Sequence, residues 1–150
     1  MTMRPLAAVL VSLAAACLDP ADGLVLSPAD EQAVQVVSGL APPLGDALTV
    51  RSATVTGDRL ELLVFYGGGR ETHRFAFGND GQQGLSLPPY LTVFVAHDGN
   101  GDSCERAVTR TLTVDLRPLR TVAGAGGVVL LRIVEPDGAA ADVGELRYDF

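Results

Sequence analysis

The sequence predicts an all-β protein, an antiparallel β-sandwich of about seven strands with an immunoglobulin-like general architecture. Apolar and polar residues alternate in a series of short segments from residue 48 to the C-terminus. These segments recur at intervals of roughly 8–12 residues, which is the spacing of a sandwich or barrel. No helical pattern of about 10–15 residues separates them, so a parallel β-α-β sheet is not expected. A chain of 150 residues has the length of one domain that can bury a core without disulfides.

The expected strands, in chain order, cover residues 48–55, 60–66, 72–77, 90–97, 107–116, 127–134 and 146–150. Side chains alternate between the two faces of a strand, so Leu60, Leu62 and Val64 share one face. Residues 127–134 are almost continuously apolar, which predicts a strand in the middle of a sheet.

The start of the domain has two interpretations. The string S-P-A-D at residues 27–30 is typical of a helix start, because serine caps well and proline suits the first helical position. It predicts a short N-terminal helix over residues 28–38, ended by Gly39. The β-branched Val34, Val36 and Val37 favour a strand in the same segment.

The first sixteen residues are typical of a secretory signal. Arg4 precedes the apolar run L-A-A-V-L-V-S-L-A-A-A at residues 6–16, which ends in small residues. The run is far shorter than the ~20 residues of a membrane-spanning helix, and no later segment fills that role. We therefore expect a signal peptide over residues 1–16, a tether over residues 17–26 and a single β-sandwich domain over residues 27–150.

Cys17 follows the apolar run directly and offers a second processing outcome. The string L-A-A-A-C at residues 13–17 is similar to a bacterial lipobox, although the large aliphatic residue stands one position early. Cys17 is then the expected lipidation site, and the protein is a lipoprotein of the cell envelope. Ordinary cleavage after Ala16 makes it a secreted protein instead. Both outcomes place the protein outside the cytoplasm.

The charge of the mature chain limits its partners. After removal of residues 1–16, ten arginines face eighteen acids, a net charge of −8, and there is no lysine. An acidic surface without basic clusters argues against nucleic acid and against attraction to anionic lipid. We expect contact with the membrane only through a lipid anchor at Cys17. An unidentified protein or another envelope component remains as the partner.

Two polar loops carry the unusual residues of the chain. The glycine loop covers residues 66–73 (YGGGRETH), and the acidic loop covers residues 97–106 (HDGNGDSCER). If consecutive strands run antiparallel, both loops lie at the same end of the sandwich. His73 and His97 also share parity with the apolar residues of their strands, so both should point inward. The expected structural loop network comprises Arg70, Glu71, His73, His97, Asp98, Asp102 and Glu105.

The same end has other interpretations. The spacing of Asp98, Asn100 and Asp102 is similar to the start of a Ca²⁺ loop, although the later EF-hand positions do not match. Zn²⁺ or copper is a second option. The candidate metal ligands are His73, His97, Asp98, Asp102 and Cys104. A third option is a cysteine nucleophile, with Cys104 activated by His73 or His97.

These loops resemble a family of small, uncharacterised exported bacterial proteins, many of them lipoproteins. The family pattern reads Y-x-G-G-C-x-x-H, then H-D-x-x-G-D-x-C-E, then F-D-L-x-P-L, and the resemblance spans residues 48–134. The third motif here is V-D-L-R-P-L at residues 114–119. The resemblance implies no established activity.

The resemblance also bears on the cysteines. It implies a family disulfide between the cysteine after the glycines and the one that matches Cys104. Arg70 stands in the first of these places here. Cys104 is therefore expected to be free or, if Cys17 escapes acylation, paired with Cys17.

Taken together, the residues predict an exported, non-enzymatic β-sandwich that acts as a binding or structural module. The alternative is a metal-binding protein that uses the end formed by the two loops. No cofactor is identified by the sequence.

Overall fold

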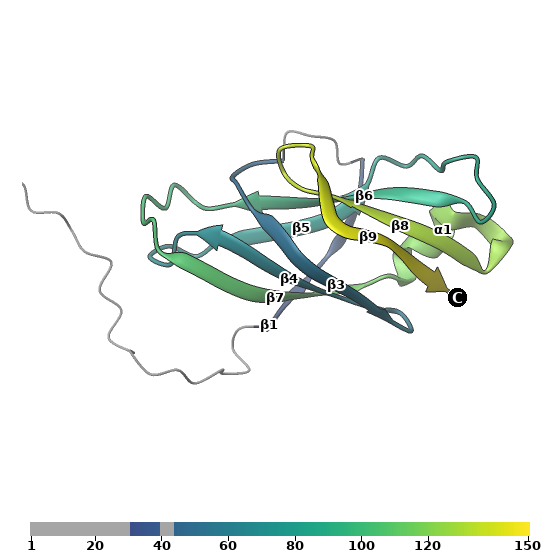
Figure 1. Ribbon diagram of the computed structural model, residues 1–150, viewed down its shortest axis with the longest axis horizontal. Coiled ribbons are helices and arrows are strands. Elements are labelled where there is room, and N and C mark those ends of the chain that lie inside the picture. The colour runs from purple at the N-terminus through teal and green to yellow at the C-terminus, as the bar shows by residue number, and fades with distance from the viewer. Residues whose placement is uncertain (1–30, 40–43) are drawn as a thin grey trace, which may run out of the picture.

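Two β-sheets account for most of the computed structural model, which describes residues 31–39 and 44–150. The strands are β1 Glu31–Val34, β2 Val36–Ser38, β3 Thr49–Thr56, β4 Arg59–Gly67, β5 Arg74–Asn79, β6 Tyr90–Asp98, β7 Ala107–Asp115, β8 Val128–Val134 and β9 Ala140–Asp149. The first sheet has the order β1-β7-β4-β3, and the second has the order β2-β5-β6-β8-β9. Figure 1 shows the resulting sandwich-like arrangement of strands.

The seven expected strands appear as β3 to β9, and six of them lie within a few residues of their predicted bounds. The last strand was predicted too short, because β9 begins at Ala140, six residues before the expected start at Leu146. The alternation argument is confirmed in β4, where Leu60, Leu62 and Val64 are completely buried. β8 lies between β6 and β9, in agreement with its almost continuous apolar sequence.

The predicted N-terminal helix is wrong over its described part, and the count of seven strands is too low. Residues 31–38 form β1 and β2 instead, interrupted only at Gln35. β1 pairs with β7 of the first sheet, and β2 pairs with β5 of the second sheet. The free edges of β7 and β5 supply hydrogen-bond partners to β1 and β2, which a lone short helix would lack. The valines of this segment also suit the extended conformation.

The sheets are mixed, so the predicted purely antiparallel arrangement is also wrong. β1 runs parallel to β7, β2 to β5, and β6 to β8. The last pair follows from the path of the chain. After β6 the chain crosses into the first sheet as β7, turns through the short helical segments η2 Arg117–Leu119, α1 Arg120–Ala123 and η3 Gly124–Gly126, and returns as β8.

The two ends of the sandwich carry different connections. The β4–β5 and β6–β7 connections lie at one end, on the left of Figure 1, and the β5–β6 loop and α1 lie at the other. Within the described ranges, no helix is long and apolar enough to cross a membrane. The expected signal peptide, the tether and Cys17 lie outside the described residues.

Candidate functional site

The glycine loop and the acidic loop lie at the same end of the sandwich, as expected. The ends of β4 and β7 pair with each other there, with Gly67 opposite Ala107. β5 and β6 also pair at this end, with Arg74 opposite Asp98. The two registers bring His73, which immediately precedes β5, next to His97, near the end of β6.

Both histidines are buried and bonded to each other. His73 is 4% exposed and His97 is 2% exposed. His73 Nδ1 lies 2.8 Å from His97 Nε2. The ring centroids are 5.0 Å apart and the ring planes differ by only 21°, so the two rings meet edge to edge. This geometry suits one hydrogen bond in the plane of both rings.

Asp102 holds the glycine loop in place. Its Oδ2 accepts hydrogen bonds from the backbone N–H groups of Gly69, Arg70 and Glu71, at 2.8, 2.8 and 2.9 Å. Its Oδ1 accepts the backbone N–H of Cys104 at 2.8 Å. These donors, that of Glu71 foremost, hold the pKa of Asp102 well below its ordinary range, because they favour the ionised carboxylate.

Asp102 also reaches the histidine pair. Its Oδ2 lies 3.2 Å from His73 Nε2, and both side chains are almost completely buried. His73, His97 and Asp102, with the backbone groups that they bind, are called the histidine network below. The network joins the two loops from inside, since one carboxylate bonds to both.

A third segment belongs to this network, and sequence reasoning missed it. His97 Nδ1 lies 3.3 Å from the carbonyl oxygen of Asp46 and 3.2 Å from that of Ala47. The backbone of His97 also bonds to this segment. Its N–H donates to the carbonyl oxygen of Leu44 at 3.0 Å, and its carbonyl oxygen accepts the N–H of Asp46 at 2.8 Å. The Asp46 carboxylate accepts the N–H of Gly99 at 2.7 Å.

The signal for this contact was Gly45. Its φ is +101°, and a Cβ there would lie 2.0 Å from the carbonyl oxygen of His97. Only glycine allows this approach of the two backbones.

Aromatic rings surround the histidines. The Tyr66 ring centroid lies 4.7 Å from that of His73 and 4.8 Å from that of His97. The Phe75 ring is almost parallel to His97, at 5.0 Å. Burial lowers the pKa of His97 from its ordinary value, because a charged ring is poorly solvated in such a setting.

The remaining residues of the expected network do not contribute buried side chains. Arg70 and Glu71 are exposed and donate through their backbone only. The exposed Asp98 accepts the backbone N–H of Asn100 at 2.8 Å and lies 4.0 Å from Arg74. Glu105 is exposed and lines a hollow of about 560 Å³ beside the histidines.

The same geometry bears on the metal hypothesis, which stays a prediction. Among the residues that the structure describes, no group of three or more histidines, cysteines and acids is placed to hold a metal ion. All four imidazole nitrogens of the pair have a hydrogen-bond partner within the protein. The carboxylates of Asp98 and Asp102 accept hydrogen bonds from different backbone groups, so the calcium-like spacing does not direct them to one common ion position.

Cys104 is buried and disulfide-bonded. The expected free thiol at this position is therefore wrong, and no described cysteine is free. The chain has one other cysteine, Cys17. Acylation of the Cys17 sulfur and its pairing with Cys104 exclude each other, because both use the same thiol. Cysteine catalysis at position 104 likewise requires a thiolate that the disulfide removes.

Thiol titration of the mature protein tests this pairing. Unfolded under non-reducing conditions, the protein is expected to show no reactive thiol, and after reduction it should show two. Intact mass should match an unacylated chain. A lipid mass on Cys17 together with one reactive thiol would contradict an intramolecular disulfide, and Cys17→Ser is the matched variant that should free Cys104.

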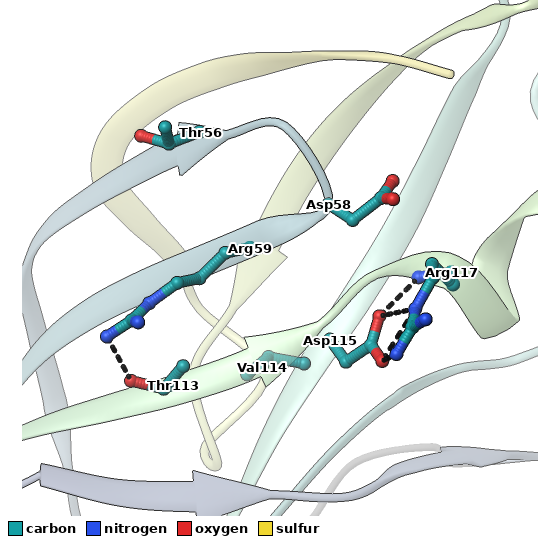
Figure 2. A pocket seen from close by; sticks show the side chains of 7 residues that line it. All are labelled: Thr56, Asp58, Arg59, Thr113, Val114, Asp115 and Arg117. Atoms are coloured by element: carbon teal, nitrogen blue, oxygen red, sulfur yellow. Dashed lines mark hydrogen bonds and ion pairs between the residues drawn. The ribbon is translucent and has the colours of Figure 1, made fainter.

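The opposite end of the sandwich carries an open pocket of about 340 Å³, shown in Figure 2. Arg117 donates from Nε to both carboxylate oxygens of Asp115, at 2.9 Å each. Arg59 lies 3.0 Å from Glu61 and 3.4 Å from the hydroxyl of Thr113. The arginines of this pocket are therefore engaged with neighbouring acids and hydroxyls, in half-exposed pairs of small energetic value.

Behind this pocket, Tyr148 ties the last strand to the β3–β4 turn. Its hydroxyl donates to the Asp58 carboxylate at 2.6 Å, and Arg120 also donates to both groups. Burial raises the pKa of Tyr148, and the hydrogen bond from Tyr148 lowers the pKa of Asp58. In this second polar cluster only Tyr148 is fully buried, and its hydroxyl links β9 to the half-exposed Asp58 and Arg120.

The fold and the loops describe an all-β protein of two mixed sheets, in which hydrogen bonds of two buried histidines join the loops at one end. Comparison with protein-family models finds no match, and comparison with curated proteins finds none. Solved structures of bacterial proteins are similar.

A NigD-like immunity protein from Bacteroides caccae has a TM-score of 0.53 at 17% identity, over 79% of this chain and 64% of its own. An uncharacterised protein from Parabacteroides merdae has a TM-score of 0.56 at 7% identity, over 79% and 66%. A protein described as a candidate lipoprotein from Bacteroides fragilis has a TM-score of 0.50 at 8% identity, over 79% and 70%. At these identities the likeness shows the fold alone, and the chain spans less than two thirds of the first protein's length.

Proposed function

We propose that the protein is an extracytoplasmic, non-enzymatic binding module that docks a protein partner through one exposed loop. The signal-like N-terminus and the resemblance of the glycine and acidic loops to exported bacterial proteins support the location. A candidate lipoprotein among the similar structures agrees with it. Secretion and lipid anchoring both satisfy this proposal.

The groups that could carry chemistry are committed to structure. The histidine ring nitrogens bond within the protein, Asp102 binds four backbone N–H groups, and Cys104 is in a disulfide. A general base needs a free lone pair within reach of a substrate proton, and in this network each histidine nitrogen already has a partner. This arrangement favours binding over catalysis.

The observation that carries the proposal is the exposure of Leu85 and Leu87. They are 106% and 99% exposed, far above the other large hydrophobic residues that the structure describes. Both lie in the leucine loop, residues 80–89, between β5 and β6. Burying one leucine side chain contributes roughly 1.5–3 kcal/mol, so leaving two of them in water is costly unless a partner covers them.

The leucine loop is fixed at its base, which suits recognition. Gly84 donates to Tyr90 O at 2.8 Å, and a Cβ at Gly84 would lie within 2.0 Å of the Tyr90 ring. Gln83 donates from its side chain to Ala123 O at 2.9 Å, and the hydroxyl of Ser86 donates to Pro88 O at 2.6 Å. A loop held in one conformation loses little entropy on binding.

Charge favours a protein over a lipid surface as the partner. Residues 81–89 carry no charge, and the mature chain has a net charge of −8 without lysine. Anionic membranes attract basic segments, and no such segment flanks the leucines. An apolar pocket on another protein accepts two leucines without needing a charged rim.

Site-specific photo-crosslinking in the exporting cell tests this proposal. A photoreactive residue in place of Leu87 should give one discrete protein adduct, and the same residue in place of the exposed Thr54 on β3 should give none. With the partner identified, Leu85→Ala is expected to weaken binding by about tenfold, since a tenfold change corresponds to about 1.4 kcal/mol. Equal labelling at both positions, or leucine-dependent sedimentation with lipid vesicles in place of a protein adduct, would overturn the docking proposal.

A further inference from the structure

The hydrogen bonds of the histidine network allow its protons to be counted. Three contacts run in a row: from the carbonyl oxygens of Asp46 and Ala47 to His97 Nδ1, from His97 Nε2 to His73 Nδ1, and from His73 Nε2 to Asp102 Oδ2. Each contact needs one proton, because the atoms that face each other are otherwise both acceptors. Two neutral imidazoles supply only two protons for these three contacts.

The third proton cannot come from Asp102. Its Oδ2 already accepts three backbone N–H groups, and its Oδ1 accepts a fourth, from Cys104. A carboxyl proton on either oxygen would point at a donor. Asp102 is therefore an anion, and the carbonyl oxygens at the other end of the row can only accept. The third proton must reside on the histidine pair.

We propose that His73 and His97 together hold one extra proton, shared across their hydrogen bond, and that gain or loss of a proton releases the glycine loop from Asp102. With one extra proton, all three contacts are satisfied and the pair is a single cation beside the Asp102 anion. The network is then a pH-sensitive latch between the glycine loop and the acidic loop.

Both departures from this state leave a repulsive contact. If the extra proton is lost, one contact of the row has two facing lone pairs, and His73 Nε2 can turn its lone pair to the Asp102 carboxylate. If a second proton is gained, two N–H groups face each other between His97 and His73 at the 2.8 Å separation of their nitrogens. The charge of His73 and the burial of His97 also disfavour the doubly charged pair.

The groups around the pair define what else titrates there. Asp102 faces it from the acidic loop, and Asp46 approaches through its bond to Gly99. Tyr66 packs against both rings from β4, and Phe75 contributes an apolar ring from β5. Glu105 is exposed at the rim of the hollow, and Cys104 does not titrate because it is disulfide-bonded. The hydrogen bonds place the extra proton on the histidine pair, so the pair is the part of this cluster through which a change of pH would act on the latch.

Nuclear magnetic resonance of the ¹⁵N-labelled protein tests the proton count directly. At about pH 7, three of the four ring nitrogens of the pair should carry a proton, His97 Nδ1 among them. Two protonated ring nitrogens, one on each histidine, would overturn the shared cation. The measurement uses the unmodified protein, so no variant has to fold.

Amide hydrogen exchange over the same pH series tests the latch. After correction for intrinsic rates, protection of the Gly69, Arg70 and Glu71 amides should fall at least tenfold when the third ring proton is lost. The amides of Gln82 and Gly84 in the leucine loop are the internal control. They donate to the Asp80 carboxylate and to the carbonyl oxygen of Tyr90, and their protection should not change. A change in ring protonation with unaltered protection of residues 69–71 would overturn the latch and leave the proposed partner docking untouched.

Discussion

Replacing Asp102 with asparagine is expected to lower the melting temperature by roughly 10 °C or more. An amide has only one accepting oxygen, whereas Asp102 accepts three backbone N–H groups at Oδ2 and one at Oδ1. In either orientation the new NH₂ group would face a donor. The charge that accompanies His73 would also be lost. Thermal denaturation followed by circular dichroism measures the effect.

Asp98→Asn is the matched control for this variant. Asp98 lies in the same loop and the substitution removes the same charge, but its side chain is exposed and accepts only one local N–H, that of Asn100. A change of about 2 °C or less is expected, as for most surface substitutions. Equal losses from both variants would mean that loop charge, and not the buried network, sets the stability.

The acid dependence of stability follows from the same residues. The pKa of Asp102 is lowered from its ordinary 3.8 in the folded protein, so its contribution is present above about pH 4 and is lost as the pH falls below that. The pKa of His97 is lowered from 6.5 by burial, so a second proton on the pair, beyond the shared one, is disfavoured in the folded protein, whereas both histidines of the unfolded chain take up a proton below that pH. Both signs predict a wild-type melting temperature that decreases with acidification below pH 6.5. The Asp102→Asn variant should show a smaller decrease below about pH 4, and an identical profile would contradict the assignment.

Replacing Gly68 with alanine is the second large expected effect. A Cβ at Gly68 would lie 2.4 Å from both Cε1 and Nε2 of His73 and 3.2 Å from Asp102 Oδ2. Its φ of +147° is a conformation that residues with a side chain rarely adopt. The glycine loop must move away from the histidine network, so we expect a fall in melting temperature of roughly 10 °C or more. Faster exchange of the Gly69 amide should accompany it.

Gly101→Ala separates the effect of the steric clash with His73 from the cost of a left-handed backbone conformation. Gly101 lies in the facing acidic loop with a φ of +69°, and a Cβ there would meet nothing within 4 Å. The free energy of unfolding of this variant should fall by only roughly 1–2 kcal/mol, the cost of placing alanine in the left-handed conformation. If Gly101→Ala destabilises as much as Gly68→Ala, contact with His73 is not the reason for glycine at position 68.

Several features could be predicted because they depend on local periodicity. The alternation of β4 places Leu60, Leu62 and Val64 inside, and the same argument turns His97 inward with its apolar neighbours. The meeting of the two loops follows from counting strand reversals, since β5 and β6 run antiparallel. These are properties of neighbouring residues and of chain direction, which the sequence carries explicitly.

Other features depend on partners that are distant in the chain. β1 and β2 became strands because β7 and β5 offered free edges, which a helix-start pattern at residues 27–30 does not reveal. The parallel pairing of β6 with β8 arose from a detour through the other sheet.

The histidines by themselves are compatible with a metal site, a catalytic site or a structural network. Only the tertiary structure decided which groups face their nitrogens. It brought the carbonyl oxygens of Asp46 and Ala47 to His97 and the carboxylate of Asp102 to His73, from segments 50 and 29 residues away in the chain. The sequence therefore determined β3 to β9 and the inward direction of the two histidines, because both follow from local alternation. The role of the pair was decided by hydrogen-bond partners that only folding brings within reach.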